Sequence, residues 1–141
     1  MIILDTDHFS ALKYSQSQSN RRLIERIESS PDQDFATTVI TLEEQMRGWL
    51  ARIHRISDIH DQVPAYARLA NLFSLFNDWT ILSFDTGAAD QFDKYRKSKI
   101  RLASMDLKIA SIAVTRDCLL LTANEQHFEQ IPGLRFENWL N

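Results

Sequence analysis

MIILDTD, residues 1–7, is the stretch that decides the fold, because four apolar residues run directly into an acidic segment. A short continuous apolar run is typical of a strand buried on both faces, as in a parallel sheet. An acid that follows such a strand lies at the carboxyl edge of the sheet, where open α/β folds bind their ligands. Asp5 and Asp7 could also cap the next helix, so this segment alone leaves a ligand site and a helix cap as alternatives.

The rest of the chain alternates apolar segments with helical patterns. Its three glycines and three prolines favour helices with short connections over an all-β fold. The expected strands are 1–4, 35–40, 79–84, 118–122 and an edge strand at 134–136. The expected helices are a short one ending near residue 16, then, after a polar loop at 15–20, others at about 22–27, 41–53, 61–76, 85–95 and 105–114. This order predicts an α/β fold, a three-layer α/β/α sandwich with a mainly parallel central sheet of about four to five strands, in a single domain over residues 1–141.

Two of these helices carry more specific signals. Thr41 and Glu44 have the spacing of a capping box, which predicts that Glu44 lies in the first turn of the helix after the second strand. The helix at 61–76 is amphipathic, and its apolar face is expected to consist of Val63, Tyr66, Leu69, Phe73 and Phe76.

Composition narrows the class of protein. The single cysteine, Cys118, excludes a disulfide framework and favours a cytoplasmic setting. No segment approaches the roughly 18 apolar residues of a membrane span, and Asp5 and Asp7 interrupt any secretory leader, so we expect neither. The net charge of −3 provides no overall attraction for nucleic acid. A polyanionic substrate would therefore need metal ions and a local basic patch.

Three carboxylates are expected to meet at one edge of the sheet. Asp5 follows the first strand, Glu44 follows the second, and Asp106 begins the buried helix before the fourth strand. Such acids repel one another unless a cation neutralises them, and Mg²⁺ or Mn²⁺ suits an all-oxygen site. An ion there could polarise a phosphodiester and activate water. Asp106 could equally be a first-turn acid favoured by the helix dipole. Thr122 and Asn124 end the fourth strand and add a hydroxyl and an amide to the same edge.

A dense basic run precedes Ser104 and Asp106. It consists of Lys94, Arg96, Lys97, Lys99 and Arg101. Next to an acidic pocket, such a rim would bind the backbone phosphates of a nucleic acid. A solvated helix face is the alternative.

Four segments, in order along the whole chain, resemble those of a known family. They are 3–7, 39–44 with Gly48, 104–110, and 121–124 with Phe128 and 131–139. This set is similar to the PIN-domain ribonucleases and, more narrowly, to VapC-type toxins of type II toxin–antitoxin pairs. The resemblance implies a Mg²⁺-dependent endoribonuclease that cleaves RNA when free and is silenced by a VapB-type antitoxin.

The resemblance also assigns roles to residues. Asp5, Glu44 and Asp106 match the acidic metal site, and Asn124 matches a position that helps to hold water at the metal. Thr6 and Ser104 match small hydroxyl residues that orient the site, next to the expected substrate contacts Lys97, Lys99 and Arg101. Asp7 is left as the capping acid. His127 departs from the pattern, because the family often has an acid there; the replacement favours one tightly held ion, unless His127 simply faces solvent.

The middle of the chain supplies unusual apolar surface. Trp49, Leu50, Ile53, Ile56 and Ile59 exceed what one helix face easily buries. A groove for an antitoxin helix or strand would use this surface, and core and homodimer packing would use it equally well. Three functions remain open from the sequence: an endoribonuclease toxin, an inactive PIN-fold module that binds RNA or an antitoxin, and a structure-specific DNA nuclease.

Overall fold

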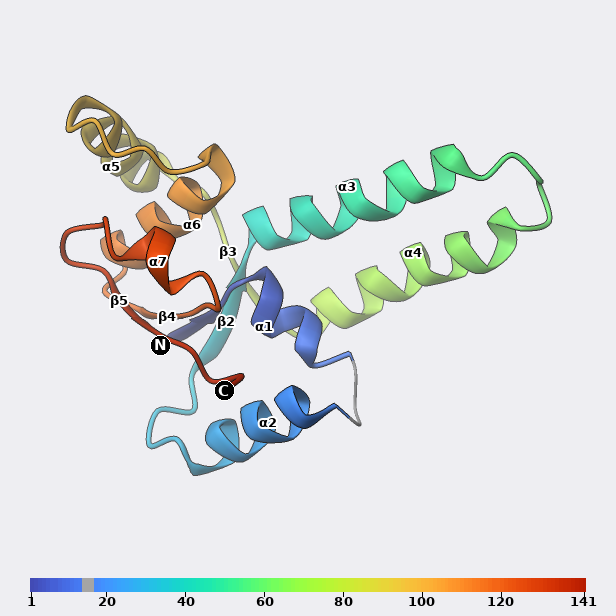
Figure 1. Cartoon of the computed structure of the whole chain (residues 1–141), viewed down its shortest axis with the longest axis horizontal. Coiled ribbons are helices and arrows are strands. Elements are labelled where there is room, and N and C mark those ends of the chain that lie inside the picture. Colours follow the sequence, from blue (N-terminus) through green and yellow to red (C-terminus); the bar gives the residue numbers. More distant parts are fainter. Residues whose placement is uncertain (14–16) are drawn as a thin grey trace.

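The computed structural model describes residues 1–13 and 17–141 and has a central parallel sheet (Figure 1). The sheet in this part of the chain has five strands in the order β3-β2-β1-β4-β5, and each neighbouring pair is parallel. The strands are β1 (Ile2–Leu4), β2 (Phe35–Thr38), β3 (Thr80–Leu82), β4 (Leu119–Leu121) and β5 (Arg135–Glu137). The predicted parallel sheet, including its edge strand near residue 136, is confirmed.

Helices cover both faces of this sheet. They are α1 (Thr6–Ala11), α2 (Gln18–Ser29), α3 (Val39–Arg55), α4 (Gln62–Asn77), α5 (Thr86–Lys97), α6 (Ser104–Thr115) and α7 (Glu125–Phe128). Because successive strand residues point to opposite faces, Ile3 packs with the α5–α6–α7 layer, whereas Ile2 and Leu4 pack with α1, α2 and α4. The predicted three-layer α/β/α sandwich is therefore confirmed.

The junction between β2 and α3 differs from the prediction. The strand ends at Thr38, and the Thr38 hydroxyl accepts a hydrogen bond from the Thr41 backbone N–H, so Thr38 is the N-cap of α3. The predicted capping box at Thr41 is wrong, because the cap lies three residues earlier. As a consequence Glu44 lies in the second turn of α3, one turn further into the helix than predicted.

The segment between α1 and α2 also differs. The Ser17 hydroxyl accepts from the Asn20 backbone N–H and caps α2, so helix begins at Gln18 where the sequence predicted a loop through residue 20. In the described part of the chain α1 ends at Ala11, and its predicted end near residue 16 lies outside the described residues.

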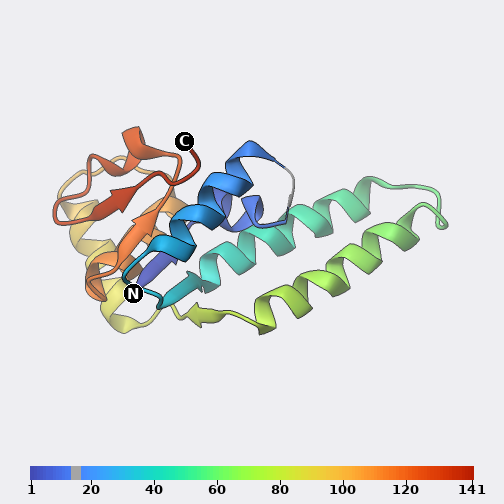
Figure 2. The same cartoon turned by 90° about the horizontal axis from the view of Figure 1, so that it is seen from below.

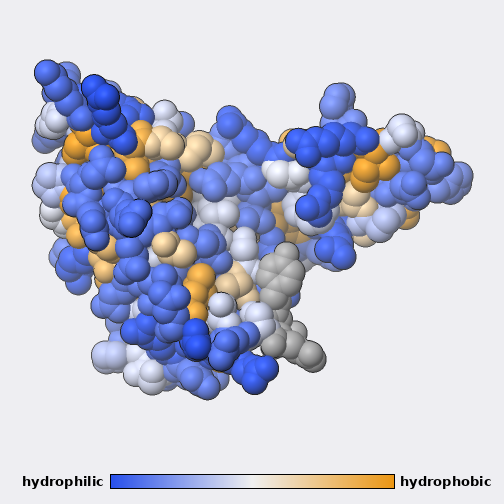
Figure 3. Space-filling view, viewed as in Figure 1, coloured by the Kyte–Doolittle hydropathy of each residue, from blue (hydrophilic) through white to orange (hydrophobic). Residues whose placement is uncertain are grey.

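Helices α3 and α4 form an arm that projects from the sandwich (Figure 2). Near the end of α4 next to the body, Leu72 and Phe76 are buried, and Ala65 is buried nearer the start of the helix. Val63, Tyr66 and Phe73 are 64%, 54% and 51% exposed, so the predicted apolar face of α4 is largely not a core face. Helix α4 packs mainly on α3, and apolar residues are visible on the arm in Figure 3.

Cys118 is a buried free thiol. None of the helices in residues 1–13 and 17–141 combines the length and the apolar character that a membrane crossing requires.

Candidate metal-binding active site

Asp5 lies at the carboxyl end of β1, between β1 and β4. It is 3% exposed, and both of its carboxylate oxygens accept hydrogen bonds. Oδ1 accepts from the Thr6 backbone N–H at 2.7 Å and so caps α1, while Oδ2 accepts from the Thr122 hydroxyl at 2.8 Å. A carboxylate has about four lone-pair positions, so capping leaves it able to bind a further group. The cap and the ligand site, alternatives in the sequence, are thus compatible.

Thr6 connects Asp5 to Glu44. Its backbone N–H binds Asp5, and its hydroxyl donates to Glu44 Oε2 at 2.8 Å. The Thr41 hydroxyl lies 3.4 Å from the same oxygen of Thr6. One threonine at the start of α1 therefore fixes the carboxylates that follow β1 and β2, consistent with the orienting role that the resemblance implied.

Asp106 lies in the first turn of α6, as predicted. Its Oδ2 is 3.8 Å from Nδ1 of His127, which is too long for a hydrogen bond but close enough for an ionic contact when the imidazole is protonated. The His127 side chain is also 61% exposed. His127 therefore faces solvent and also stands beside an acid of the site, and the single ion that it was expected to favour stays a prediction.

The three predicted metal ligands share an electrostatic penalty. Burial, followed by the charge of Asp7, raises the pKa of Asp5 to about 7. Burial also raises the pKa of Glu44 and of Asp106, and nearby carboxylates add to each effect. The charge of Asp7 raises the pKa of all three acids, and Asp106 adds to the effect at Asp5 and Glu44. A bound cation would offset both the burial and this repulsion.

Asp7 does not cap a helix as predicted, because Asp5 is the N-cap of α1. Asp7 Oδ2 accepts from the Ala123 backbone N–H at 2.9 Å, and Oδ1 lies 2.6 Å from Nδ1 of His8. His8 is fully buried, and its Nε2 accepts from the Trp139 backbone N–H at 3.0 Å, so its proton is on Nδ1. This chain of bonds joins the C-terminal segment to the acidic edge. The direct succession of Asp7 and His8 was the sequence signal for it.

Asn124 and Ser104 lie near the edge without direct bonds to its carboxylates. The Asn124 backbone N–H donates to the Thr122 hydroxyl, and its exposed side chain has no hydrogen-bond partner among the described residues. Ser104 is exposed and accepts from Arg96 at 3.3 Å.

The predicted basic rim is split by the structure. Arg96 turns back onto its own loop and donates to the carbonyls of Ile100 and Leu102, which stabilises the approach to α6. Lys97, Lys99 and Arg101 are exposed, and their side chains form no hydrogen bond or ion pair within residues 1–13 and 17–141. Sharing of a substrate by these cations and the acidic edge stays a prediction.

The chemistry of the donors fits Mg²⁺ or Mn²⁺, but their arrangement is open. The donors are all oxygens, and burial, with a smaller effect of neighbouring carboxylates, raises their pKa values. Among the described residues, however, no group of three His, Cys, Asp or Glu side chains forms a ready ligand set. Mg²⁺ is usually held by one or two carboxylates and keeps several waters, so this open arrangement suits it better than a closed protein cage would.

Comparisons with known proteins agree with this architecture. The family model of the PIN domain matches residues 2–134, whereas no curated protein sequence matches the chain. Among solved structures, VapBC-1 from nontypeable Haemophilus influenzae is 21% identical with a TM-score of 0.71, and the match covers 100% of both chains. VapBC2 from Rickettsia felis, bound to a promoter DNA fragment, is 20% identical with a TM-score of 0.68 over 99% of each chain. FitAcB from Neisseria gonorrhoeae is 22% identical with a TM-score of 0.70, over 99% of this chain and 98% of that one. At these identities the likeness establishes a common fold.

Proposed function

The chain belongs to the PIN domain family, and from that premise we propose that it is a metal-dependent endoribonuclease that acts as the toxin of a toxin–antitoxin pair. The observation that carries the proposal is the acidic edge, where burial and the charges of neighbouring carboxylates raise the pKa values of Asp5, Glu44 and Asp106. Acids with perturbed pKa values cluster at functional sites. Oxygen donors of this kind suit Mg²⁺ or Mn²⁺, and phosphodiester hydrolysis is the reaction that fits such a site.

Each residue has a distinct role in this proposal. Asp5 and Asp106 hold the ion, and Glu44 completes the shell or positions the attacking water. When bound, the ion would polarise the scissile phosphodiester and ease deprotonation of that water. Thr6 keeps Glu44 in place through its 2.8 Å hydrogen bond, and the Asn124 amide is free to orient the water.

The proposed partners are an antitoxin of the VapB type and a second copy of the chain. One similar solved structure is a toxin–antitoxin complex from Klebsiella pneumoniae, and another is a member of the VapBC family of toxin–antitoxin systems from Mycobacterium tuberculosis. In this chain Leu50 and Ile59, two of the residues singled out as surplus apolar surface, are 51% and 69% exposed, whereas Ile53 is buried. Exposed apolar side chains of this kind favour a protein partner. The cytoplasm is the proposed setting, since the free thiol of Cys118 needs reducing conditions to persist.

The test is cleavage of RNA by the purified chain. We expect cleavage with Mg²⁺ or Mn²⁺, none after EDTA, and none from Asp106→Asn, while Asp93→Asn on the exposed side of α5 serves as the matched control. A single-stranded DNA of the same sequence should be left intact. Cleavage of the DNA instead would favour a DNA nuclease, and a folded protein without metal-dependent cleavage would contradict the proposal.

A further inference from the structure

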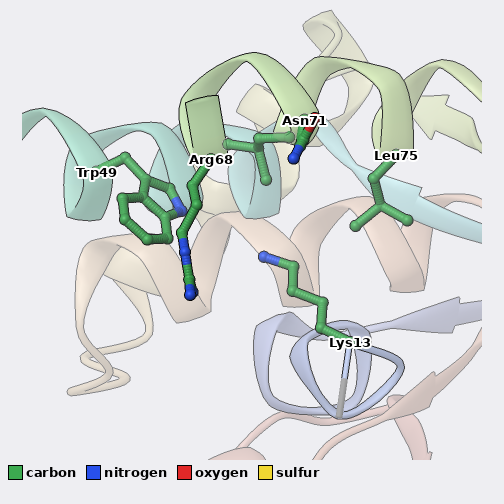
Figure 4. Close-up of a pocket in the computed structure, with 6 residues that line it drawn as sticks. Lys13, Trp49, Arg68, Asn71 and Leu75 are labelled. Atoms are coloured by element: carbon green, nitrogen blue, oxygen red, sulfur yellow. The ribbon is translucent and has the colours of Figure 1, made fainter. Parts of the chain in front are cut away.

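A basic pocket lies on the α3–α4 arm directly beside Glu44. It is lined by Lys13, Gly48, Trp49, Arg52 and Arg68, has a volume of about 330 Å³, and reaches Glu44 itself. A second pocket of about 270 Å³ adjoins it and shares Lys13, Trp49 and Arg68. Figure 4 shows Arg68 descending from α4 beside the Trp49 indole, while Lys13 points up into the same space from the end of α1.

The cations of this pocket are held in place but not neutralised. The Arg52 and Arg68 guanidinium carbons lie 4.7 and 5.9 Å from the centre of the Trp49 ring, within the range of cation–π contacts. In the part of the chain that the structure describes, neither arginine forms an ion pair or a hydrogen bond. Lys13 Nζ donates to Gln45 Oε1 at 2.7 Å, and burial lowers the pKa of this lysine. Three positive charges therefore face one pocket without a carboxylate partner of their own.

Gly48 keeps the pocket open. Glycine in the middle of a helix weakens it, and a Cβ at Gly48 would meet no atom within 4 Å, so close packing does not require the glycine. Glu44, Gly48 and Arg52 follow one another at intervals of four residues and therefore lie on one face of α3. A side chain at Gly48 would stand between the acid and the arginine.

We propose that this basic pocket binds the phosphates of the RNA segment next to the cleaved bond, with Arg52, Arg68 and Lys13 as the phosphate contacts and Trp49 as the residue that positions the guanidinium groups. The inference rests on the proposed endoribonuclease function. Along α3, Arg52 lies about 12 Å from Glu44, so the phosphates held here belong to nucleotides that flank the cleaved one. Planar guanidinium groups bind phosphate oxygens in pairs. Because the chain as a whole carries −3, its net charge does not attract RNA, and local cations such as these three must supply the attraction.

The test measures binding of a fluorescent single-stranded RNA to the full-length chain in EDTA, by anisotropy over a range of salt. We expect R52A/R68A to weaken binding about tenfold or more, and the slope of log Kd against log salt to fall by about 1.4 for two lost phosphate contacts. Trp49→Leu should weaken binding less. Arg47→Ala is the matched control, because Arg47 lies on the same helix, is 71% exposed, and pairs with Glu43; its Kd should stay that of the wild type.

Gly48→Leu separates a loss of RNA affinity from a loss of stability. The Cβ of the leucine enters open space and leucine is a better helix former than glycine, so urea denaturation should show no loss of stability, while RNA affinity should fall about tenfold. Unchanged affinity in both Gly48→Leu and R52A/R68A would overturn the inference, as would loss of affinity only in a variant lacking Lys97, Lys99 and Arg101. Polyglutamate displacing the RNA at equal charge concentration would show that the pocket takes acidic peptide instead, and would also overturn it.

The same samples separate this inference from the proposed function. A wild-type chain that cleaves RNA with Mg²⁺ while the pocket variants bind normally disproves only the pocket. A wild-type chain that binds RNA through the pocket without cleaving it disproves the nuclease proposal and leaves the phosphate contacts standing.

Discussion

The acidic edge of the sheet and the basic pocket of the arm share Glu44, yet the fold holds them in opposite ways. At the edge, Asp5 is buried with two hydrogen bonds and a pKa raised to about 7. In the pocket, Arg52 and Arg68 lie against one indole ring without ionic partners among the described residues, and α3, which carries Arg52, is weakened by Gly48. The edge thus carries the cost of buried carboxylates at the strand ends, and the pocket gives up helix stability to remain open. Both give up stability in places where a ligand could restore it.

The largest expected effect is the loss of RNA cleavage when the charge of Asp5 is removed from the acidic edge. Asp5→Asn keeps the cap on α1, because an asparagine oxygen accepts from the Thr6 N–H, but it removes the proposed ligand charge. We expect RNA cleavage to fall by at least about a thousandfold, the upper end of what one essential polar group contributes. At the same time the metal-free protein should become more stable at pH 8, since a repelling charge is gone.

Cleavage rates and urea denaturation of Asp5→Asn, with Asp93→Asn alongside, check both effects. An Asp5→Asn protein that still cleaves RNA would remove Asp5 from the proposed site.

The second prediction concerns how the stability of the protein depends on pH, because the Asp5 carboxylate is buried. The folded pKa of Asp5 lies above its ordinary value of 3.8, so the folded state binds the proton more tightly than the unfolded state does. Its stabilising contribution is complete below about pH 4 and is lost as pH rises through about 7. A pKa rise from 3.8 to about 7 corresponds to about 4 kcal/mol.

Urea denaturation in EDTA from pH 4 to pH 8 should show this loss in the wild type and not in Asp5→Asn. Mg²⁺ or Mn²⁺ should restore stability at the high-pH end. A wild type and a variant with parallel pH profiles would contradict the burial penalty at Asp5.

The third prediction concerns the hydrogen bond between Thr6 and Glu44, the residue that the two regions share. Thr6→Val removes the hydroxyl that donates to Glu44, whose pKa should then rise further. Loss of an outer partner of this kind typically weakens metal binding 10–100-fold, so we expect about tenfold weaker activation by Mn²⁺. Thr6→Ser retains the hydroxyl and should behave like the wild type in the same titration; equal weakening in both variants would point to packing of the methyl group instead.

The smallest expected effect is a change in the free energy of unfolding at Gly48, which tests whether the pocket is open at this position. Gly48→Ala should raise the free energy of unfolding by about 1 kcal/mol, because alanine is the better helix former and its methyl meets no neighbour. Gly133→Ala is the contrasting control: Gly133 has a φ of +79°, so alanine there should lower stability by about 1 kcal/mol. Thermal and urea unfolding measure both, and a destabilised Gly48→Ala would mean that the helix face at Gly48 is not open.

The acidic edge was accessible from the sequence because each acid follows or begins an element whose apolar pattern is plain. Asp5 after an apolar run and Asp106 at the start of a buried helix could be placed at one edge from strand order alone. Glu44 was placed one turn too early, since the choice between Thr38 and Thr41 as the cap depends on how far β2 extends. Asp7 was misjudged because its partner, Ala123, lies 116 residues away in the sequence.

The basic pocket left no comparable pattern. Lys13 follows α1, whereas Arg52 lies on α3 and Arg68 on α4, and none of them forms a run with the others. The basic run that was visible, at 94–101, was only partly available for a ligand, because Arg96 bonds to its own loop. Local clustering in a sequence therefore identified the more conspicuous set of cations and not the one that lines the pocket beside Glu44.

By itself the sequence determined the alternating strands and helices, the parallel sheet and the convergence of three acids on its carboxyl edge. These follow from hydrophobic period and strand order, which are local properties of the chain. Only the tertiary structure decided which oxygen each acid presents, that Asp5 both caps α1 and faces β4, and that α3 and α4 leave the sandwich as an arm with a basic pocket at its base. Those features depend on contacts between residues distant in the chain, and their energies arise from burial and charge proximity that exist only after folding.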